Sequence, residues 1–172
     1  MGDQSEIVVR RVQPADGRLV REVRLRSLFS DPASFGSTYE REAAFSDADW
    51  DEWASDDAAG DDMATLLALR RGEPVGIVGA FRDDDEASLF HVIAMWVAPD
   101  ERGRGLGRRL LGEIEGWIAA SGGSTVQLSV ADSAEPARRL YESAGYSPDG
   151  ESIPSPHHPG VRHVSLRRPL SP

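Results

Sequence analysis

A short stretch of alternating glycines and arginines is the part of the sequence best suited to bind an anion. Its members are Arg102, Gly103, Arg104, Gly105, Gly107 and Arg108. Glycine allows tight turns and brings backbone N–H groups close to a ligand. The first turn of a helix carries unpaired N–H groups and a partial positive charge. If a helix begins within this stretch, the combination predicts a site for a phosphate or pyrophosphate.

The flanking sequence predicts a strand before this stretch and a helix after it. Residues 88–97 form an apolar run rich in β-branched and aromatic side chains, which indicates a buried strand. Pro99 ends that strand because proline cannot donate to a sheet ladder. Apolar residues then recur at spacings of three and four, as on one face of a helix: Leu106, Leu110, Leu111, Ile114, Trp117 and Ile118.

Two common phosphate-binding motifs do not fit this stretch. A dinucleotide-binding loop needs glycine where this chain has Arg108. A Walker A loop needs lysine, and all 19 basic residues of the sequence are arginine. An ordinary glycine- and arginine-rich connection is the remaining alternative to a phosphate site.

The spacing Arg102-x-x-Gly105-x-Gly107, preceded by Val97-x-Pro99, resembles the pyrophosphate loop of the Gcn5-related N-acetyltransferases (GNATs). The resemblance implies acetyl-CoA as cosubstrate. It also implies that the coenzyme contacts Val97, Arg102, Gly103, Arg104, Gly105, Leu106, Gly107 and Arg108.

A second segment is similar to another GNAT signature. Pro136 suits a first helical turn and Gly145 a left-handed helix end, so residues 135–145 predict a helix. Within it, the pattern Ala137-x-x-Leu140-Tyr141-x-x-x-Gly145-Tyr146 resembles the family pattern at the expected distance after the coenzyme loop. The family often has asparagine, which touches the pantetheine arm, at the position of Ala134. Asp132 or Ser133 could replace that contact or cap the helix.

Acetyl transfer to an amine needs a base, an oxyanion donor and an acid for the leaving thiolate. The resemblance implies direct attack in a ternary complex, with Tyr141 as general acid and a backbone N–H near Val97 as oxyanion donor. A buried structural role is the alternative for Tyr141. For the base we expect His91, whose ordinary pKa is suitable. The alternative for His91 is a structural role. In that case the base would be Glu40 or an ordered water chain.

The acceptor is expected to contact residues 33–40, a polar segment with two aromatic residues. Functional residues concentrate on such loops, and in GNATs the first two helices and their connection line the acceptor pocket. The candidates are Phe35, Ser37, Tyr39 and Glu40. The alternative is a helix–helix connection whose aromatic residues pack on the core.

Composition narrows the function further. A formal net charge of −10 argues against nucleic-acid binding and is compatible with a cationic small-molecule amine. The sequence contains no cysteine, which excludes disulfides and a cysteinyl intermediate. His157 and His158, adjacent in a proline-rich loop, are weak evidence for a metal, so we expect none. With no apparent signal or membrane span, we expect a cytoplasmic protein; a homodimer, common among GNATs, is left open.

At 172 residues, the chain predicts one domain, residues 1–172. Strands are expected at 7–12, 65–69, 74–81, 88–97, 125–130 and 161–166. One helix is expected at 18–29, with Asp16 as its cap. A second helix is expected to begin after the N-cap Ser46, with Trp50 and Trp53 packed inward. Residues 55–62 and 147–160 are expected to be loops. The resemblance implies an α/β fold with a mixed, mostly antiparallel twisted sheet of six to seven strands. Strands four and five are parallel, and about four helices flank the sheet.

We therefore expect an acetyl-CoA-dependent N-acetyltransferase that acts on a small-molecule amine. A protein or peptide N-acetyltransferase is the alternative within the same class of enzyme. A regulatory module that binds coenzyme A without turnover is the alternative from another class.

Overall fold

A computed structural model of the chain describes residues 6–150 and 152–171. Its centre is a mixed sheet in the order β1-β2-β3-β4-β5-β8-β6, with β7 also paired to β8. The strands are β1 (Ile7–Arg11), β2 (Met63–Arg70), β3 (Glu73–Arg82), β4 (Leu89–Val97), β5 (Thr125–Ala131), β6 (Ser147–Pro148), β7 (Ile153–Pro154) and β8 (Arg162–Pro169). In the described residues, β4 and β5 are the only two strands that pair in parallel, as predicted.

In the described residues, five α-helices and three short 3₁₀ turns surround the sheet. The helices are α1 (Gly17–Ser30), α2 (Tyr39–Ala43), α3 (Asp47–Asp57), α4 (Leu106–Ala120) and α5 (Glu135–Ser143). The 3₁₀ turns are η1 (Pro14–Asp16), η2 (Pro32–Ser34) and η3 (Pro99–Glu101). Among the described residues, no helix is long and apolar enough to cross a membrane.

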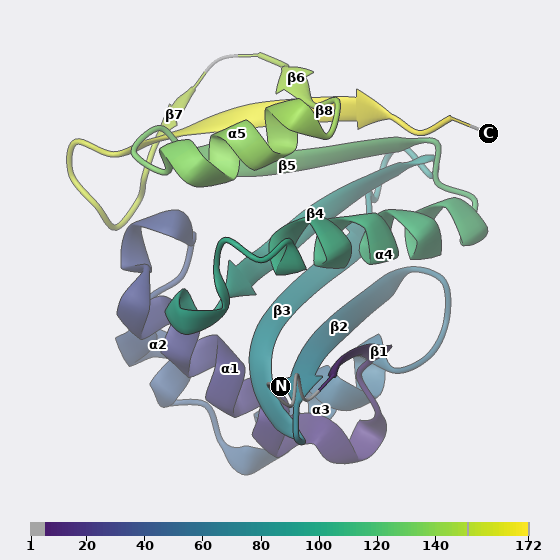
Figure 1. Cartoon of the computed structure of the whole chain (residues 1–172), viewed down its shortest axis with the longest axis vertical. Coiled ribbons are helices and arrows are strands. Elements are labelled where there is room, and N and C mark those ends of the chain that lie inside the picture. Colours follow the sequence, from purple (N-terminus) through teal and green to yellow (C-terminus); the bar gives the residue numbers. More distant parts are fainter. Residues whose placement is uncertain (1–5, 151, 172) are drawn as a thin grey trace, which may run out of the picture.

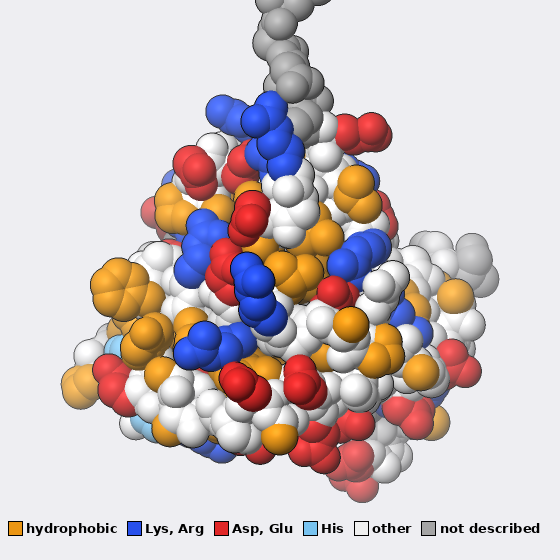
Figure 2. Space-filling view, turned by 90° about the horizontal axis from the view of Figure 1, so that it is seen from below, with side chains coloured by type: hydrophobic (Ala, Val, Ile, Leu, Met, Phe, Trp, Pro, Cys, Tyr) orange, Lys and Arg blue, Asp and Glu red, His pale blue; other side chains and the backbone are white. Residues whose placement is uncertain are grey.

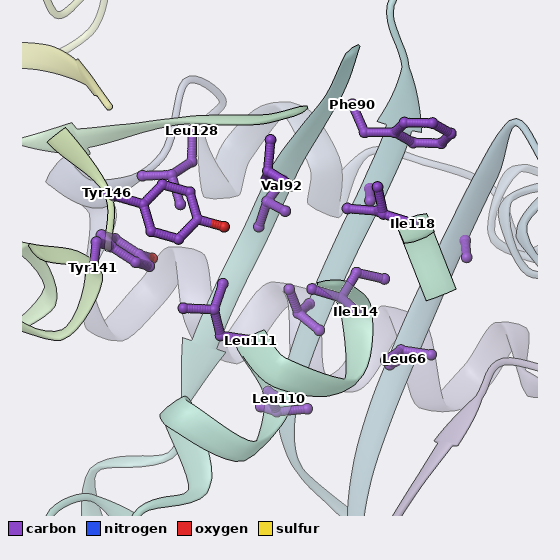
Figure 3. Packing of buried hydrophobic residues seen from close by; sticks show 14 of the residues in the cluster. Leu66, Phe90, Val92, Leu110, Leu111, Ile114, Ile118, Leu128, Tyr141 and Tyr146 are labelled. Carbon is purple, nitrogen blue, oxygen red and sulfur yellow. The ribbon is translucent and has the colours of Figure 1, made fainter. Parts of the chain in front are cut away.

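The sheet separates two hydrophobic clusters. On one face, α4 presents the predicted apolar stripe, and Leu110, Ile114 and Ile118 are fully buried against the sheet (Figure 3). On the other face, α1 and α3 contribute Val23, Leu28 and Trp50 to the second cluster. Because both faces of the central strands are covered, their sequences are apolar runs without strict alternation.

Strands β4 and β5 pair only over Leu89–Thr125, Phe90–Val126 and His91–Gln127. Beyond these pairs the two strands diverge toward the side on which the loop before α4 lies (Figure 1). The register between β3 and β4 also shifts between the pairs Gly79–Ile93 and Ile77–Trp96, and Ala94 has a φ of +56°. This β-bulge reverses which side chains face which side of the sheet after Ile93. The result is an opening in the middle of the sheet.

Several local predictions are confirmed. The hydroxyl of Ser46 accepts a hydrogen bond from the N–H of Asp49, and the Asp49 carboxylate accepts one from the N–H of Ser46, so α3 begins with a capping box. Trp50 is buried, and Trp53 stacks on it with 5.6 Å between ring centroids. The helix α4 starts at Leu106, inside the glycine-rich stretch.

Other local predictions were wrong. Asp16 makes no side-chain cap to α1; its carboxylate instead accepts hydrogen bonds from Arg10 and from the N–H of Gln13. The segment 55–62 is not wholly an exposed loop, because α3 continues to Asp57. The Asp57 carboxylate is half-buried and accepts hydrogen bonds from Thr65 and Trp53.

The expected loops at 33–40 and 147–160 also contain regular structure. Tyr39 and Glu40 open the helix α2, which Thr38 caps by accepting from the N–H of Arg41. Within 147–160, the described residues include the short strands β6 and β7, and each pairs with β8. Such two-residue strands carry no sequence periodicity, so only the pairing with β8 reveals them.

Candidate active site

The glycine-rich stretch forms a cradle between β4 and α4. Gly103 and Gly105 have φ of +76° and +84°, the left-handed region that favours glycine. Gly105 is the N-cap of α4, and the N–H of Arg109 donates to its carbonyl over 3.0 Å. The N–H groups of residues 106–108 therefore precede the helical hydrogen-bond ladder and can serve an anion.

Two contacts hold this cradle in place. The Glu101 carboxylate, buried at the start of the loop, accepts hydrogen bonds from Nε and Nη2 of Arg70 at 2.7 and 2.8 Å. The Arg70 guanidinium lowers the pKa of Glu101, so the carboxylate stays charged at neutral pH. On the other side, a Cβ on Gly107 would stand 3.2 Å from Cδ2 of Leu140. Glycine at this position allows the first turn of α4 to approach α5 closely.

The three arginines of the stretch lie in different surroundings. Arg102 donates from Nε to the carbonyl of Val97 and from Nη2 to Asp31, at 2.9 and 2.7 Å. Arg108 donates to the hydroxyl of Ser143 on α5. The Arg104 side chain is two-thirds exposed and lies 3.7 Å from Glu101. Arg102 thus connects the predicted coenzyme loop to the end of α1.

A cavity of about 730 Å³ lies over this cradle. Seven of the eight predicted coenzyme residues line it, namely Val97, Arg102, Gly103, Gly105, Leu106, Gly107 and Arg108. Arg104 is not among its lining residues. The opposite wall comes from α5 and the segment before it, including Ala134, Leu140 and Tyr141. Its size lies in the range of small-molecule and cofactor sites.

A second cavity of about 520 Å³ lies on the other side of the opening between β4 and β5. A narrow passage of about 80 Å³ has walls in common with both cavities. It shares Met95 and Tyr141 with the first cavity, and Ile93, Ala94 and Ser129 with the second. The bulge in β4 therefore lies where two molecules bound in the two cavities would meet.

Tyr141 lies at this meeting point. Its ring belongs to the hydrophobic cluster under α4 and makes an edge contact with Tyr146, with 6.0 Å between centroids (Figure 3). In the described part of the chain, no hydrogen bond joins its hydroxyl to another residue, although Tyr141 lines both the first cavity and the passage. Burial raises the pKa of Tyr141, which keeps the hydroxyl protonated. A protonated hydroxyl with no protein partner can donate to a bound molecule.

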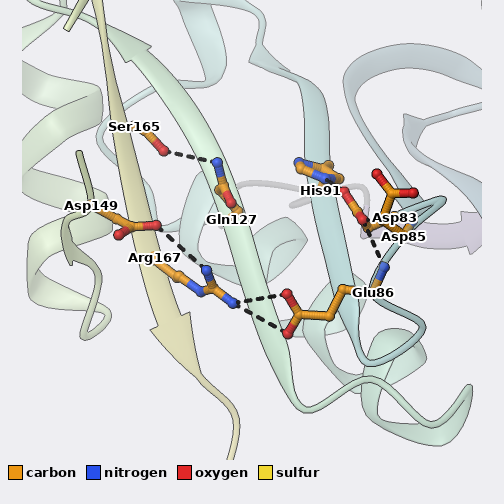
Figure 4. Close-up of polar contacts among 8 residues, drawn as sticks. All are labelled: Asp83, Asp85, Glu86, His91, Gln127, Asp149, Ser165 and Arg167. Atoms are coloured by element: carbon orange, nitrogen blue, oxygen red, sulfur yellow. Dashed lines mark hydrogen bonds and ion pairs between the residues drawn. The ribbon is translucent and has the colours of Figure 1, made fainter. Parts of the chain in front are cut away.

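His91 lies in the second cavity, stacked on Phe81 with 4.9 Å between ring centroids. Its Nε2 is 2.7 Å from Oδ2 of Asp83 (Figure 4). The hydrogen bond with His91 holds the pKa of Asp83 below its ordinary value. His91 does not line the passage, whereas its neighbours Val92 and Ile93 do. The structure thus separates the predicted acid and the predicted base onto two cavities.

The four predicted acceptor residues divide into two pairs. Phe35 lines both cavities and the passage, and Ser37 lines the second cavity. Tyr39 and Glu40 line none of these spaces. Both are exposed on α2, and Tyr39 makes an edge contact with Phe29. Glu40 is thus placed away from the passage.

Among the lining residues of the second cavity that sequence reasoning did not identify are Arg24, Trp53 and His163. Arg24 comes from α1, Trp53 from α3 and His163 from β8, so only the fold brings them together. Arg24 binds Glu42 through Nε and Nη2, at 2.8 and 3.0 Å, inside the protein. The helical position of Arg24, between the buried Val23 and Ser27, is a sequence signal that could have identified it as an inward-facing charge.

The remaining predictions concern metals and surface charge. Among residues 6–150 and 152–171, no group of three potential metal ligands is present. His157 is exposed, while Nε2 of His158 is buried without a partner. In the view from below, basic and acidic side chains intermix over the face, with hydrophobic side chains between them (Figure 2). This face does not present the continuous basic surface that a nucleic acid would need.

Comparisons with known proteins agree with this geometry. The model of the Acetyltransferase (GNAT) family matches residues 23–146. An IAA acetyltransferase from Azospirillum brasilense is 33% identical over 109 residues, which are 63% of this chain and 69% of that protein. A GNAT-family acetyltransferase from Streptococcus pneumoniae has a TM-score of 0.84 at 22% identity, over 96% of this chain and 100% of the other. The structure of yncA from Salmonella typhimurium with its cofactor acetyl-CoA has a TM-score of 0.80 at 16% identity, over 98% and 96% of the two chains.

Proposed function

Because the chain belongs to the GNAT family of acetyltransferases, we propose that it transfers the acetyl group of acetyl-CoA to the amine of a small molecule by direct attack in a ternary complex. One observation carries the proposal: two cavities on opposite sides of the split sheet share one passage, and Tyr141 lies in it. Two substrates bound at once would meet there, without a covalent enzyme intermediate. The absence of cysteine from the sequence fits the same route.

The first cavity fits acetyl-CoA. The N–H groups of residues 106–108 would bind the pyrophosphate, with Arg108 beside them. The apolar wall formed by Ala134, Ala137 and Leu140 would contact the pantetheine arm. The asparagine common in GNATs at position 134 is replaced here by alanine, so this side chain gives the arm a contact without a hydrogen bond.

Tyr141 would protonate the thiolate as the amine forms its bond to the acetyl carbon and the carbon–sulfur bond breaks. Burial raises the pKa of Tyr141, so its hydroxyl is protonated at neutral pH and has a proton to donate as the thiolate leaves. The bulge removes Ala94 and Met95 from regular pairing with β3, and both residues line the passage. A backbone N–H there is the candidate donor to the developing oxyanion.

His91 remains our candidate base, with Asp83 orienting its ring. Because His91 lines the acceptor cavity outside the passage, it would take the proton from the acceptor through an ordered water. The base would then be His91 acting through an ordered water, which combines two of the candidates predicted from the sequence. Glu40, exposed on α2 and outside the cavity lining, is the weaker candidate.

The size of the second cavity favours a small acceptor over a protein. A volume of about 520 Å³ lies within the range of small-molecule sites. Residues 34–37 contribute to its walls, and so do Ile153, Pro154 and Pro156. A peptide N-acetyltransferase would instead need an open groove for an extended chain.

The test is thiol release from acetyl-CoA with a panel of small amines and a matched panel of peptides with free N-termini. The sequence contributes no cysteine thiol to the signal. We expect release with at least one small amine and none above the hydrolysis background with peptides. Turnover with peptides alone would overturn the small-molecule assignment. Acetyl-CoA binding with no turnover on either panel would favour a regulatory coenzyme-binding module.

A further inference from the structure

The side chains that line the second cavity indicate a class of acceptor. This inference rests on the proposed function, in which the acceptor binds in that cavity. Its walls are apolar and aromatic, with Phe35, Trp53, Phe81, Ile93 and Ile153 among them. Phe81, Ile93 and Ile153 are three of the seven large hydrophobic side chains that are exposed in the described part of the chain. Exposed apolar side chains gathered in one concave site indicate a ligand with an apolar body.

No carboxylate is among the residues of the described chain that line this cavity. Two lining residues pair with acidic groups outside the lining: Arg24 with Glu42, and His91 with Asp83. A polycationic acceptor would therefore find no counter-charge in the cavity wall. The expectation of a cationic acceptor came from the net charge of the whole chain, and the lining of the cavity favours a different class.

Three hydrogen-bonding groups of this cavity have no partner among the described residues. Nε and Nη2 of Arg24 bind Glu42, but Nη1 makes no hydrogen bond. The hydroxyl of Ser37 and Nε2 of His163 are buried and unpartnered, and His163 is only 8% exposed. A buried polar atom without a partner destabilises the free protein. On residues that line a cavity, such atoms are candidates for hydrogen bonds to a bound ligand.

These three groups belong to residues of one cavity lining and have one chemistry in common. Arg24, Ser37 and His163 line the part of the cavity that it does not share with the passage. All three can donate a hydrogen bond: the guanidinium always, the hydroxyl by rotation, and the imidazole as its Nε2–H tautomer. Three donors on residues that line one cavity suit a carboxylate, whose two oxygens accept several hydrogen bonds.

We propose that the acceptor is an amino carboxylic acid in which an apolar, planar body separates the amine from the carboxylate. The amine points into the passage beside Ala94 and Tyr141. The body lies between Trp53, Phe81 and Ile93, and Arg24, Ser37 and His163 bind the carboxylate at the far end. Arg24 is held in position by Glu42 and by its contact with the ring of Phe35, 5.0 Å from the guanidinium carbon to the ring centroid.

The test uses a matched pair of probes, para-aminomethylbenzoate and benzylamine, which differ only in the carboxylate. Spermidine serves as the polycationic control. We expect kcat/KM for para-aminomethylbenzoate to exceed that for benzylamine by at least roughly tenfold, since hydrogen bonds to a charged group are the stronger kind. Equal values for the two probes, or a preference for spermidine, would overturn the carboxylate site.

Variants then assign the preference to named residues. Ser37→Ala removes a hydroxyl that has no protein partner, so the fold should be retained while the preference falls severalfold. Ser155→Ala is the matched control, because its hydroxyl is also buried and unpartnered but does not line the cavity. The double variant Arg24→Gln/Glu42→Gln removes both charges of the pair together and avoids a lone buried charge. We expect it to abolish the preference; an unchanged preference in Ser37→Ala and in the double variant would refute the assignment.

The outcomes separate this inference from the proposed function. If acetyl-CoA binds and other amines are acetylated but para-aminomethylbenzoate is not, the proposed acceptor class is wrong. The proposed acetyltransferase function is then still supported. If acetyl-CoA neither binds nor loses its acetyl group with any amine, the proposed function fails first.

Discussion

Two tyrosines of one cluster allow a sharp test of the proposed acid. Tyr141 and Tyr146 are in edge contact, yet their hydroxyls differ. The Tyr146 hydroxyl donates to Glu115 over 2.7 Å, and no described residue pairs with that of Tyr141. Phenylalanine in place of either tyrosine keeps the ring. The two substitutions should therefore separate catalysis from stability.

For Tyr141→Phe we expect kcat to fall by about 10²–10⁴-fold, the range for loss of a general acid. The free energy of unfolding should change by less than about 1 kcal/mol, since no hydrogen bond within the protein is lost. For Tyr146→Phe we expect the reverse. Loss of a hydrogen bond to a charged group costs about 1.5–3 kcal/mol, or a drop in Tm of roughly 3–10 °C, with kcat nearly unchanged.

The assay is thiol release at saturating acetyl-CoA with an amine acceptor, combined with thermal unfolding of each variant. Because burial raises the pKa of Tyr141, its hydroxyl stays protonated, and the ratio of wild-type to Tyr141→Phe rates should be constant from about pH 6 to 9. If Tyr141→Phe retained kcat within about twofold of the wild type, the role of Tyr141 as general acid would be refuted.

Three further predictions concern the elements that support the site. Gly105→Ala places a side chain at a φ of +84°, which costs about 1–2 kcal/mol and should raise the KM for acetyl-CoA. The control is Gly112→Ala, at an exposed position inside α4. It should stabilise the protein by roughly 0.5–1 kcal/mol and leave the KM for acetyl-CoA unchanged. Ser46→Ala removes the N-cap of α3 and should lower the free energy of unfolding by about 1 kcal/mol in urea titrations, whereas an unchanged midpoint would argue against the capping box. Asp16, whose pKa is lowered mainly by its hydrogen bond with Arg10, stabilises the fold above the ordinary carboxyl pKa of about 3.9 and loses this effect as pH falls through its lower folded pKa. The stability gap between the wild type and Asp16→Asn should thus be full at neutral pH and shrink in acid, and a gap that does not depend on pH would contradict this linkage.

The sequence predicted the elements whose signals are local. The apolar run at 88–97, the glycine-rich start of α4 and the cap at Ser46 each depend on residues within one or two turns of chain. Their positions agree with the structure to within about two residues, the ordinary uncertainty of element boundaries. The family resemblance added the strand order that such local signals do not contain.

What could not be predicted depends on contacts between distant segments. Asp16 looked like a helix cap, but β1 places Arg10 within reach, and an ion pair replaces the cap. Asp57 looked solvated among four aspartates, but β2 brings Thr65 beside it. The bulge at Ala94 leaves no trace in the apolar run, because β4 carries apolar side chains on both faces. Phe35, Ser37 and His91 were predicted as site residues and line the second cavity. Arg24, Trp53 and His163 were not predicted, because they come from three separate elements that only the fold brings together.

The most direct test of the account is thermal unfolding of the wild type with acetyl-CoA, and with ATP and NAD as controls that also carry phosphates. A ligand at about 100 times its dissociation constant adds roughly 2.7 kcal/mol to the folded state, which for a chain of this size raises Tm by about 5–10 °C. We predict this shift with acetyl-CoA and little or none with ATP or NAD. No shift, or an equal shift with ATP, would contradict the assignment of the 102–108 loop to coenzyme A.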